Sequence, residues 1–179
     1  KIKLMQNENK IKLFLVDDDA LFLKSLEIEF MEHADFDIQT FATGELCVAN
    51  LSKQPDVIIL DFHLDGIDTT AMNGLETLDT IKNKRQDIPV IMLSSQDKID
   101  VAIKCMHHEA YDYVVKSETA FVRLQKIINS IFLYSKMKKE LNSQGLGKIL
   151  GASITINDKY YTSTSKDVLY TVENNLQIN

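Results

Sequence analysis

The chain alternates short apolar runs with longer segments in which apolar residues recur at helical spacing. A short apolar run predicts a buried strand, and the helical spacing predicts a helix with one face on the core. We expect strands at Ile11–Val16, Phe36–Phe41, Val57–Leu60, Val90–Leu93 and Tyr111–Val115. We expect helices at Ala20–His33, Gly44–Lys53, Gly74–Lys84, Asp97–Glu109 and Glu118–Lys139.

This strict alternation predicts an α/β fold. We expect a doubly wound, five-stranded parallel sheet with right-handed crossovers and helices on both faces. Each helix should turn one apolar stripe toward the sheet. The stripes expected to face inward contain Leu23, Leu26 and Phe30; Cys47 and Leu51; Leu75, Leu78 and Ile81; Ile99, Ile103 and Met106; and Phe121, Leu124, Ile128 and Ile131.

Composition and charge are those of an ordinary globular protein: 179 residues, of which 45% are hydrophobic and 26% charged. The net charge of −6 makes direct binding to nucleic acid unexpected. No apolar run approaches the ~18–20 residues needed to cross a bilayer. Residues 1–10 lack the apolar core of a signal peptide, so we expect no export, no membrane partner and a cytoplasmic location. Cys47 and Cys105 lack metal-ligand spacing and are expected to be reduced thiols.

The pattern divides the chain into a lead-in at 1–10, a main domain at 11–139 and a C-terminal extension of unknown role at 140–179. Within the extension, Ala152–Ile156 and Val168–Val172 are possible short strands. The extension is either a small dimerising or docking segment or the start of a larger output domain.

Reactive side chains follow the expected strands. Asp17–Asp19 follow the first strand, Asp61 the third, Ser94 the fourth and Lys116 the fifth. In a doubly wound sheet, the ligand site lies beyond the carboxyl ends of the strands, where the strand order reverses. We therefore expect these side chains to converge on one crevice.

The chemistry of this set points to phosphoryl transfer. Crowded carboxylates repel one another unless a cation neutralises them, and oxygen ligands favour Mg²⁺. Lys116 adds a positive charge, and Ser94 offers a hydroxyl that can donate to a phosphoryl oxygen. Because phosphoryl transfer depends mostly on positioning and charge neutralisation, the set predicts transfer of a phosphoryl group to the carboxylate of Asp61.

Four motifs closely resemble those of the receiver domain of bacterial two-component response regulators. They are Val16-Asp17-Asp18, the VIILD that ends in Asp61, the IMLSS around Ser94 and the DYVVK that ends in Lys116. The resemblance covers roughly residues 11 to 137 and implies a flavodoxin-like sheet of order 2-1-3-4-5. It also implies a signalling switch rather than an enzyme, phosphorylated with Mg²⁺ by a sensor histidine kinase or a phosphotransfer protein.

The resemblance also implies a role for individual residues. The roles are the phosphoacceptor (Asp61), the Mg²⁺ ligands (Asp17, Asp18, Asp61 and the backbone carbonyl of His63) and the phosphate-contacting or switch residues (Ser94, Lys116 and Tyr113). Asp19 is expected to cap the helix that follows it. Phosphorylation would favour binding of a downstream protein or of a second copy, for which Val101, Cys105 and His108 are surface candidates.

The chain departs from the family pattern at several positions. Extra residues lie within 64–73, directly after the acceptor, and should alter access to it. Ser117 stands where the family has proline, so the peptide bond before it is either trans or a strained cis bond. His63 and Gln96 occupy positions that, in the family, tune how water attacks the acyl phosphate.

Two other functions remain open at this point. The chain is alternatively the receiver part of a transcription factor whose DNA-binding domain lies elsewhere. It is alternatively a small Mg²⁺-dependent phosphatase with an aspartyl nucleophile. Such phosphatases usually need a second aspartate two residues after the nucleophile, and this chain has His63 there.

Overall fold

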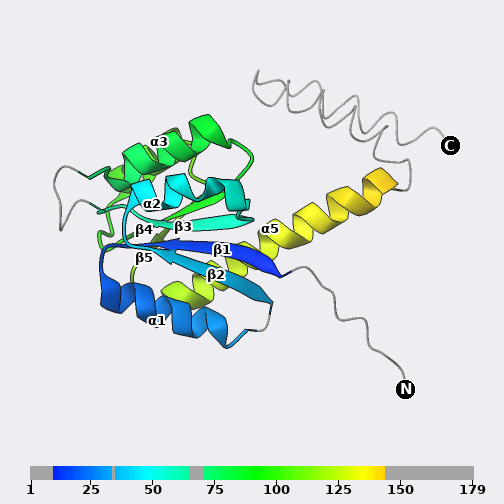
Figure 1. Cartoon of the computed structure of the whole chain (residues 1–179), viewed down its shortest axis with the longest axis horizontal. Coiled ribbons are helices and arrows are strands. Elements are labelled where there is room, and N and C mark those ends of the chain that lie inside the picture. The colour runs from blue at the N-terminus through cyan, green and yellow to red at the C-terminus, as the bar shows by residue number, and fades with distance from the viewer. Residues whose placement is uncertain (1–9, 34, 65–70, 144–179) are drawn as a thin grey trace. The chain divides into compact units, whose positions relative to one another are not determined.

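The computed structural model describes residues 10–33, 35–64 and 71–143. Its elements alternate along the chain as predicted (Figure 1). The strands are β1 Ile11–Val16, β2 Phe36–Phe41, β3 Val57–Asp61, β4 Val90–Ser94 and β5 Asp112–Val115. The helices are α1 Ala20–Met31, α2 Gly44–Ala49, the 3-10 helix η1 Leu51–Lys53, α3 Gly74–Lys84, α4 Ile99–His107 and α5 Ala120–Ser143.

The strands form one parallel sheet in the order β2-β1-β3-β4-β5, which confirms the predicted topology. The strand order reverses between β1 and β3, the place where doubly wound sheets bind ligands. In the sheet register, Val16 lies beside Leu60, and Asp61 lies beside Leu93. The strand ends that carry the predicted reactive residues are therefore adjacent.

Helices cover both faces of the sheet, because alternate strand residues point to opposite sides. One core lies between the sheet and helices α2, α3 and α4, and it includes Phe14, Leu60 and Met92. On the opposite face, Figure 1 shows α1 beside the first part of α5, and the rings of Phe30 and Phe121 meet edge to face. The residues buried in the helices as predicted include Leu26, Phe30, Cys47, Leu51, Leu78, Ile81, Leu124 and Ile128.

The stripe predicted for α4 is wrong. Ile99, Ile103 and Met106 are 79%, 50% and 48% exposed, whereas Cys105 is fully buried and Val101 packs against the same core. The segment carries apolar residues at helical spacing on two sides, and the side with the smaller residues faces the sheet. Cys105 is therefore not available as a surface contact, and the apolar residues that α4 exposes are those of the predicted inner stripe.

Gly74 lets α3 begin directly against the segment after β3. A β-carbon on Gly74 would lie 2.3 Å from the backbone oxygen of Asp61 and 2.6 Å from Cα of Phe62. The Gly74 N–H donates to the Phe62 carbonyl at 3.1 Å. Asn73 and Glu76 form a reciprocal capping box that fixes this first turn. The segment that follows Asp61 is thus held against the start of α3.

No cis peptide bond occurs in the part of the chain that the structure describes, so the bond before Ser117 is trans. Among the same residues, no helix combines the length and the apolar character needed to cross a membrane. The chain divides into two compact units, Lys1–Ile128 and Asn129–Asn179, and α5 belongs to both. Residues 1–9 of the lead-in, residues 65–70 of the segment 64–73 that contains the insertion, and the extension from residue 144 onward, with its possible strands, lie outside the described residues.

Candidate functional site

Three aspartates from adjacent strand ends form the centre of the site. Asp17 and Asp61 are each 2% exposed, and Asp18 is partly buried. A carboxylate oxygen of each lies within 4.8 Å of the other two. Asp19 is not part of this group: its Oδ1 accepts two backbone N–H bonds, at 2.9 and 3.1 Å, from the first turn of α1. This confirms the prediction that Asp19 caps α1.

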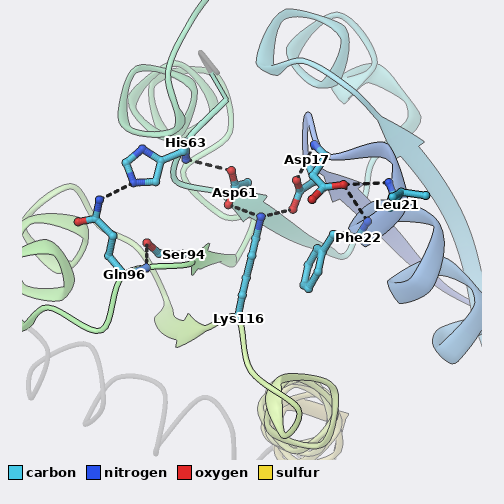
Figure 2. Close-up of polar contacts among 9 residues, drawn as sticks. Asp17, Leu21, Phe22, Asp61, His63, Ser94, Gln96 and Lys116 are labelled. Atoms are coloured by element: carbon cyan, nitrogen blue, oxygen red, sulfur yellow. Dashed lines mark hydrogen bonds and ion pairs between the residues drawn. The ribbon is translucent and has the colours of Figure 1, made fainter. Parts of the chain in front are cut away.

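Lys116 extends from the end of β5 and pairs with both buried carboxylates (Figure 2). Its Nζ lies 2.7 Å from Asp17 Oδ2 and 2.8 Å from Asp61 Oδ1. Its backbone N–H donates to the Ser94 carbonyl at 2.8 Å, which holds it beside β4. The His63 N–H donates to Asp61 Oδ2 at 3.0 Å. Both oxygens of the Asp61 carboxylate are therefore oriented by neighbouring groups.

Burial and charge set the protonation of these groups. Burial raises the pKa of Asp61, Lys116 opposes this and the charge of Asp17 adds to it, so that the pKa moves from the usual 3.8 to about 6. Burial also raises the pKa of Asp17 against the opposing effect of Lys116. Burial alone would lower the pKa of Lys116, but the hydrogen bonds and charges of both carboxylates outweigh it and raise the pKa. Because its pKa of about 6 lies below neutral pH, the carboxylate of Asp61 is mostly ionised there.

The aspartates fit a hard divalent cation. Asp17 Oδ2 is buried, and the Lys116 ammonium lies 2.7 Å from it. A carboxylate oxygen has more lone pairs than one ammonium uses, and a bound cation would use the remaining ones. Clustered carboxylate oxygens with excess negative charge are the ligands that Mg²⁺ prefers. Asp17, Asp18 and Asp61 can therefore hold Mg²⁺, and their role as its ligands, like that of the His63 carbonyl, stays a prediction.

Gln96 connects the two residues predicted to switch. Ser94 is fully buried, and its Oγ accepts a hydrogen bond from the Gln96 N–H at 3.1 Å. Tyr113 is 8% exposed, and its hydroxyl donates to the Gln96 carbonyl. The Ser94 hydroxyl and the Tyr113 ring are therefore held by the backbone of one residue.

The side chain of Gln96 also reaches across the crevice to His63. The Nε2 atoms of the two residues are 3.1 Å apart, and a dashed line in Figure 2 marks this contact. The sequence indicated both positions but not their contact. This bridge joins the segment after β3 to the segment after β4. It lies next to Asp61, because the His63 N–H donates to the Asp61 carboxylate.

The segment with the extra residues is anchored at both ends. Leu64 is 2% exposed at its start. At its end, the Met72 N–H donates to Glu45 Oε1 at 2.6 Å, and Asn73 caps α3. Its described ends are therefore held against α2 and α3.

Phe22 belongs to the site, although the sequence analysis did not single it out. The ammonium of Lys116 lies 4.6 Å from the centroid of the Phe22 ring (Figure 2). A phenylalanine in an amphipathic helix usually indicates core packing. The sequence feature that could have indicated Phe22 is its position in the first turn of the helix that follows the acidic loop, Asp17–Asp19.

A comparison with family models matches most of this fold. The model of the response regulator receiver domain covers residues 13–129. The chain belongs to this family. The matched range contains every strand end of the site, from Asp17 to Lys116. The receiver domain is the signalling module of two-component systems, and an acceptor aspartate and Mg²⁺ binding are typical of it.

Similar proteins place this receiver domain within longer chains. The regulatory protein LuxO of Vibrio cholerae is 27% identical over 151 residues, which are 83% of this chain and 32% of LuxO. A protein-glutamate methylesterase/protein-glutamine glutaminase of Treponema pallidum is 35% identical over 146 residues, which are 76% of this chain and 35% of that protein. The chain thus spans about a third of the length of these relatives.

A solved structure shows the same fold. The receiver domain of the Francisella response regulator 1452 superposes with a TM-score of 0.60 at 22% identity, over 70% of this chain and 99% of that one.

Proposed function

We propose that Asp61 is the phosphoacceptor of a switch that receives its phosphoryl group from a sensor histidine kinase or a phosphotransfer protein. The observation that carries this proposal is the placement of Asp61: 2% exposed, at a strand end, 2.8 Å from the ammonium of Lys116 and clustered with Asp17 and Asp18. The membership of the chain in the receiver family supports the same assignment of Asp61 as the phosphoacceptor. The proposal also includes the roles that the sequence motifs imply for the Mg²⁺ ligands and for the phosphate-contacting or switch residues.

In the transfer step, a carboxylate oxygen of Asp61 attacks the phosphorus of a phosphohistidine. The P–N bond breaks as the P–O bond forms, and the imidazole leaves with the electron pair and takes up a proton. Burial raises the pKa of Asp61 to about 6, so the carboxylate is mostly ionised at neutral pH yet more basic than an exposed one. Lys116, whose ammonium lies 2.8 Å from Asp61, and Ser94 are the groups proposed to contact the phosphoryl oxygens.

The metal ligands in this proposal are Asp17, Asp18, Asp61 and the backbone carbonyl of His63. When bound, Mg²⁺ would neutralise negative charge on the phosphoryl oxygens. The carboxylates would hold the cation, which would give the buried Oδ2 of Asp17 a second positive partner beside Lys116. Lys116 provides the second positive charge.

Phosphorylation would act on the rest of the domain through Gln96. A phosphoryl oxygen that accepts a bond from the Ser94 hydroxyl would shift the segment whose backbone contacts both Ser94 and Tyr113. The output is then a change in protein contacts, made with a downstream protein or a second copy in the cytoplasm. The exposed Ile99, Ile103 and Met106 of α4 replace Cys105 as candidates for that contact.

The proposal is tested by incubation with Mg²⁺ and a small acyl-phosphate donor, followed by intact-mass measurement. Wild type should gain one phosphate, and Asp61→Asn should gain none. Asp37→Asn, which changes an exposed aspartate on β2, is the matched control and should behave as wild type. No adduct on wild type with any donor would refute the proposal.

A further inference from the structure

The Phe22 ring contacts the ammonium group on which the proposed transfer depends. Lys116 Nζ lies 4.6 Å from the ring centroid, in addition to its contacts with Asp17 and Asp61. A cation within about 6 Å of an aromatic centroid is attracted by the negative face of the ring. The Lys116 side chain is 16% exposed, so water screens this attraction only partly.

Local structure fixes the position of Phe22. Its backbone N–H donates to Oδ1 of Asp19, the N-cap of α1, at 3.1 Å. The Asp19 N–H donates in turn to Asp17 Oδ1 at 3.0 Å. The first turn of α1 is therefore tied to the acidic loop, and the ring is held beside the Lys116 ammonium.

The ring differs from the other partners of this ammonium. Both carboxylates change their charge state in the proposed function, because Asp61 becomes an acyl phosphate, whose charge lies on the phosphoryl oxygens, and Asp17 would bind a cation that repels Lys116. Neither event changes Phe22. The ring is thus a partner of Lys116 whose charge distribution the transfer does not change.

We propose that Phe22 is a positioning residue, which keeps the Lys116 ammonium beside Asp61 through the attraction between ring face and cation. This proposal rests on the function proposed for Asp61. It predicts that the rate of phosphorylation depends on the electron density of the ring at position 22 as well as on the size of that ring.

The sharpest test replaces Phe22 with phenylalanines that carry one, two and three ring fluorines. Fluorine withdraws electron density from the ring face with little change of shape. We expect the phosphorylation rate, measured by intact mass with an acyl-phosphate donor, to fall stepwise to about 3- to 10-fold below wild type. Phe22→Leu should fall by a similar factor, and Phe22→Tyr should keep most of the rate.

The same fluorinated series at Phe36 is the matched control. Phe36 lies on β2, and its ring contacts Phe30 at 5.2 Å between centroids. Fluorination there should leave the rate unchanged. Equal rates across the series at Phe22 would overturn the proposal.

A second measurement separates this proposal from the function of Asp61. A double-mutant cycle of Phe22→Leu and Lys116→Met, followed by urea unfolding without Mg²⁺ or phosphodonor, measures the contact directly. We expect Phe22→Leu to lower the folding equilibrium constant several-fold more with Lys116 present than with methionine there. Additive effects would overturn the Phe22 proposal, whereas wild type that takes up no phosphate would overturn the proposed acceptor.

Discussion

Replacing Asp61 by asparagine should stabilise the Mg²⁺-free protein at neutral pH. The folded state holds a carboxylate whose pKa is about 6 instead of 3.8, mainly because it is buried. A group with a higher pKa in the folded state binds more protons there than in the unfolded state. Its contribution to stability is therefore complete below about pH 4 and is lost as the pH rises through about 6.

The difference between 3.8 and about 6 corresponds to roughly 3 kcal/mol of unfolding free energy. An asparagine oxygen at position 61 can still accept the His63 N–H, which lies 3.0 Å from Asp61 Oδ2. The substitution also removes one partner of Lys116, which offsets part of the gain. We therefore expect Asp61→Asn to be more stable than wild type by about 1–3 kcal/mol at pH 7 and about equally stable at pH 4.

Urea unfolding in EDTA, at intervals from about pH 4 to 7.5, measures this difference. Asp37→Asn is the control, because it removes an exposed charge on β2 and should follow wild type at every pH. An Asp61→Asn protein that is less stable than wild type at pH 7, or a difference that stays constant across this range, would refute the reasoning.

The other predictions concern the surroundings of Asp61. Lys116→Met should slow phosphorylation at least about tenfold, because it removes the ammonium 2.8 Å from the acceptor; an unchanged time course by intact mass would contradict this. His63→Ala should slow loss of the phosphate several-fold by removing an imidazole that can orient water, and Gln96→Ala should act in the same direction; decay rates equal to wild type would exclude the bridge from this step. Gly74→Ala should cost about 2–4 kcal/mol in urea unfolding, since its β-carbon would lie 2.3 Å from a backbone oxygen, and a smaller loss would mean that α3 shifts easily.

The topology could be predicted because each central strand is a separate apolar run between helical segments. Val57–Leu60 shows this well, because it is buried throughout. A short continuous apolar run is typical of a strand that is covered on both faces. The α4 stripe could not be predicted, because apolar residues at helical spacing lie on two sides of that helix. The packing of side chains against the sheet decides which side of the helix is buried, and the spacing of apolar residues gives no information about that packing.

Those members of the site that are reactive side chains at strand ends could be predicted from the sequence. Asp17, Asp61 and Lys116 meet because parallel strands bring their carboxyl ends to one edge. The link through Gln96 was not predictable, because its backbone N–H and carbonyl make the contacts and every residue has these groups. The contact between Phe22 and Lys116 could not be predicted for a different reason, since an aromatic residue in a helix normally indicates core packing.

Locating the phosphate within the chain tests the central claim most directly. Borohydride reduces an aspartyl phosphate to homoserine, so wild type phosphorylated with Mg²⁺ and an acyl-phosphate donor can be reduced, digested and sequenced by mass spectrometry. The proposed function predicts homoserine at position 61 and unmodified Asp17 and Asp18. Homoserine at Asp17 or Asp18, or at no position, would contradict it.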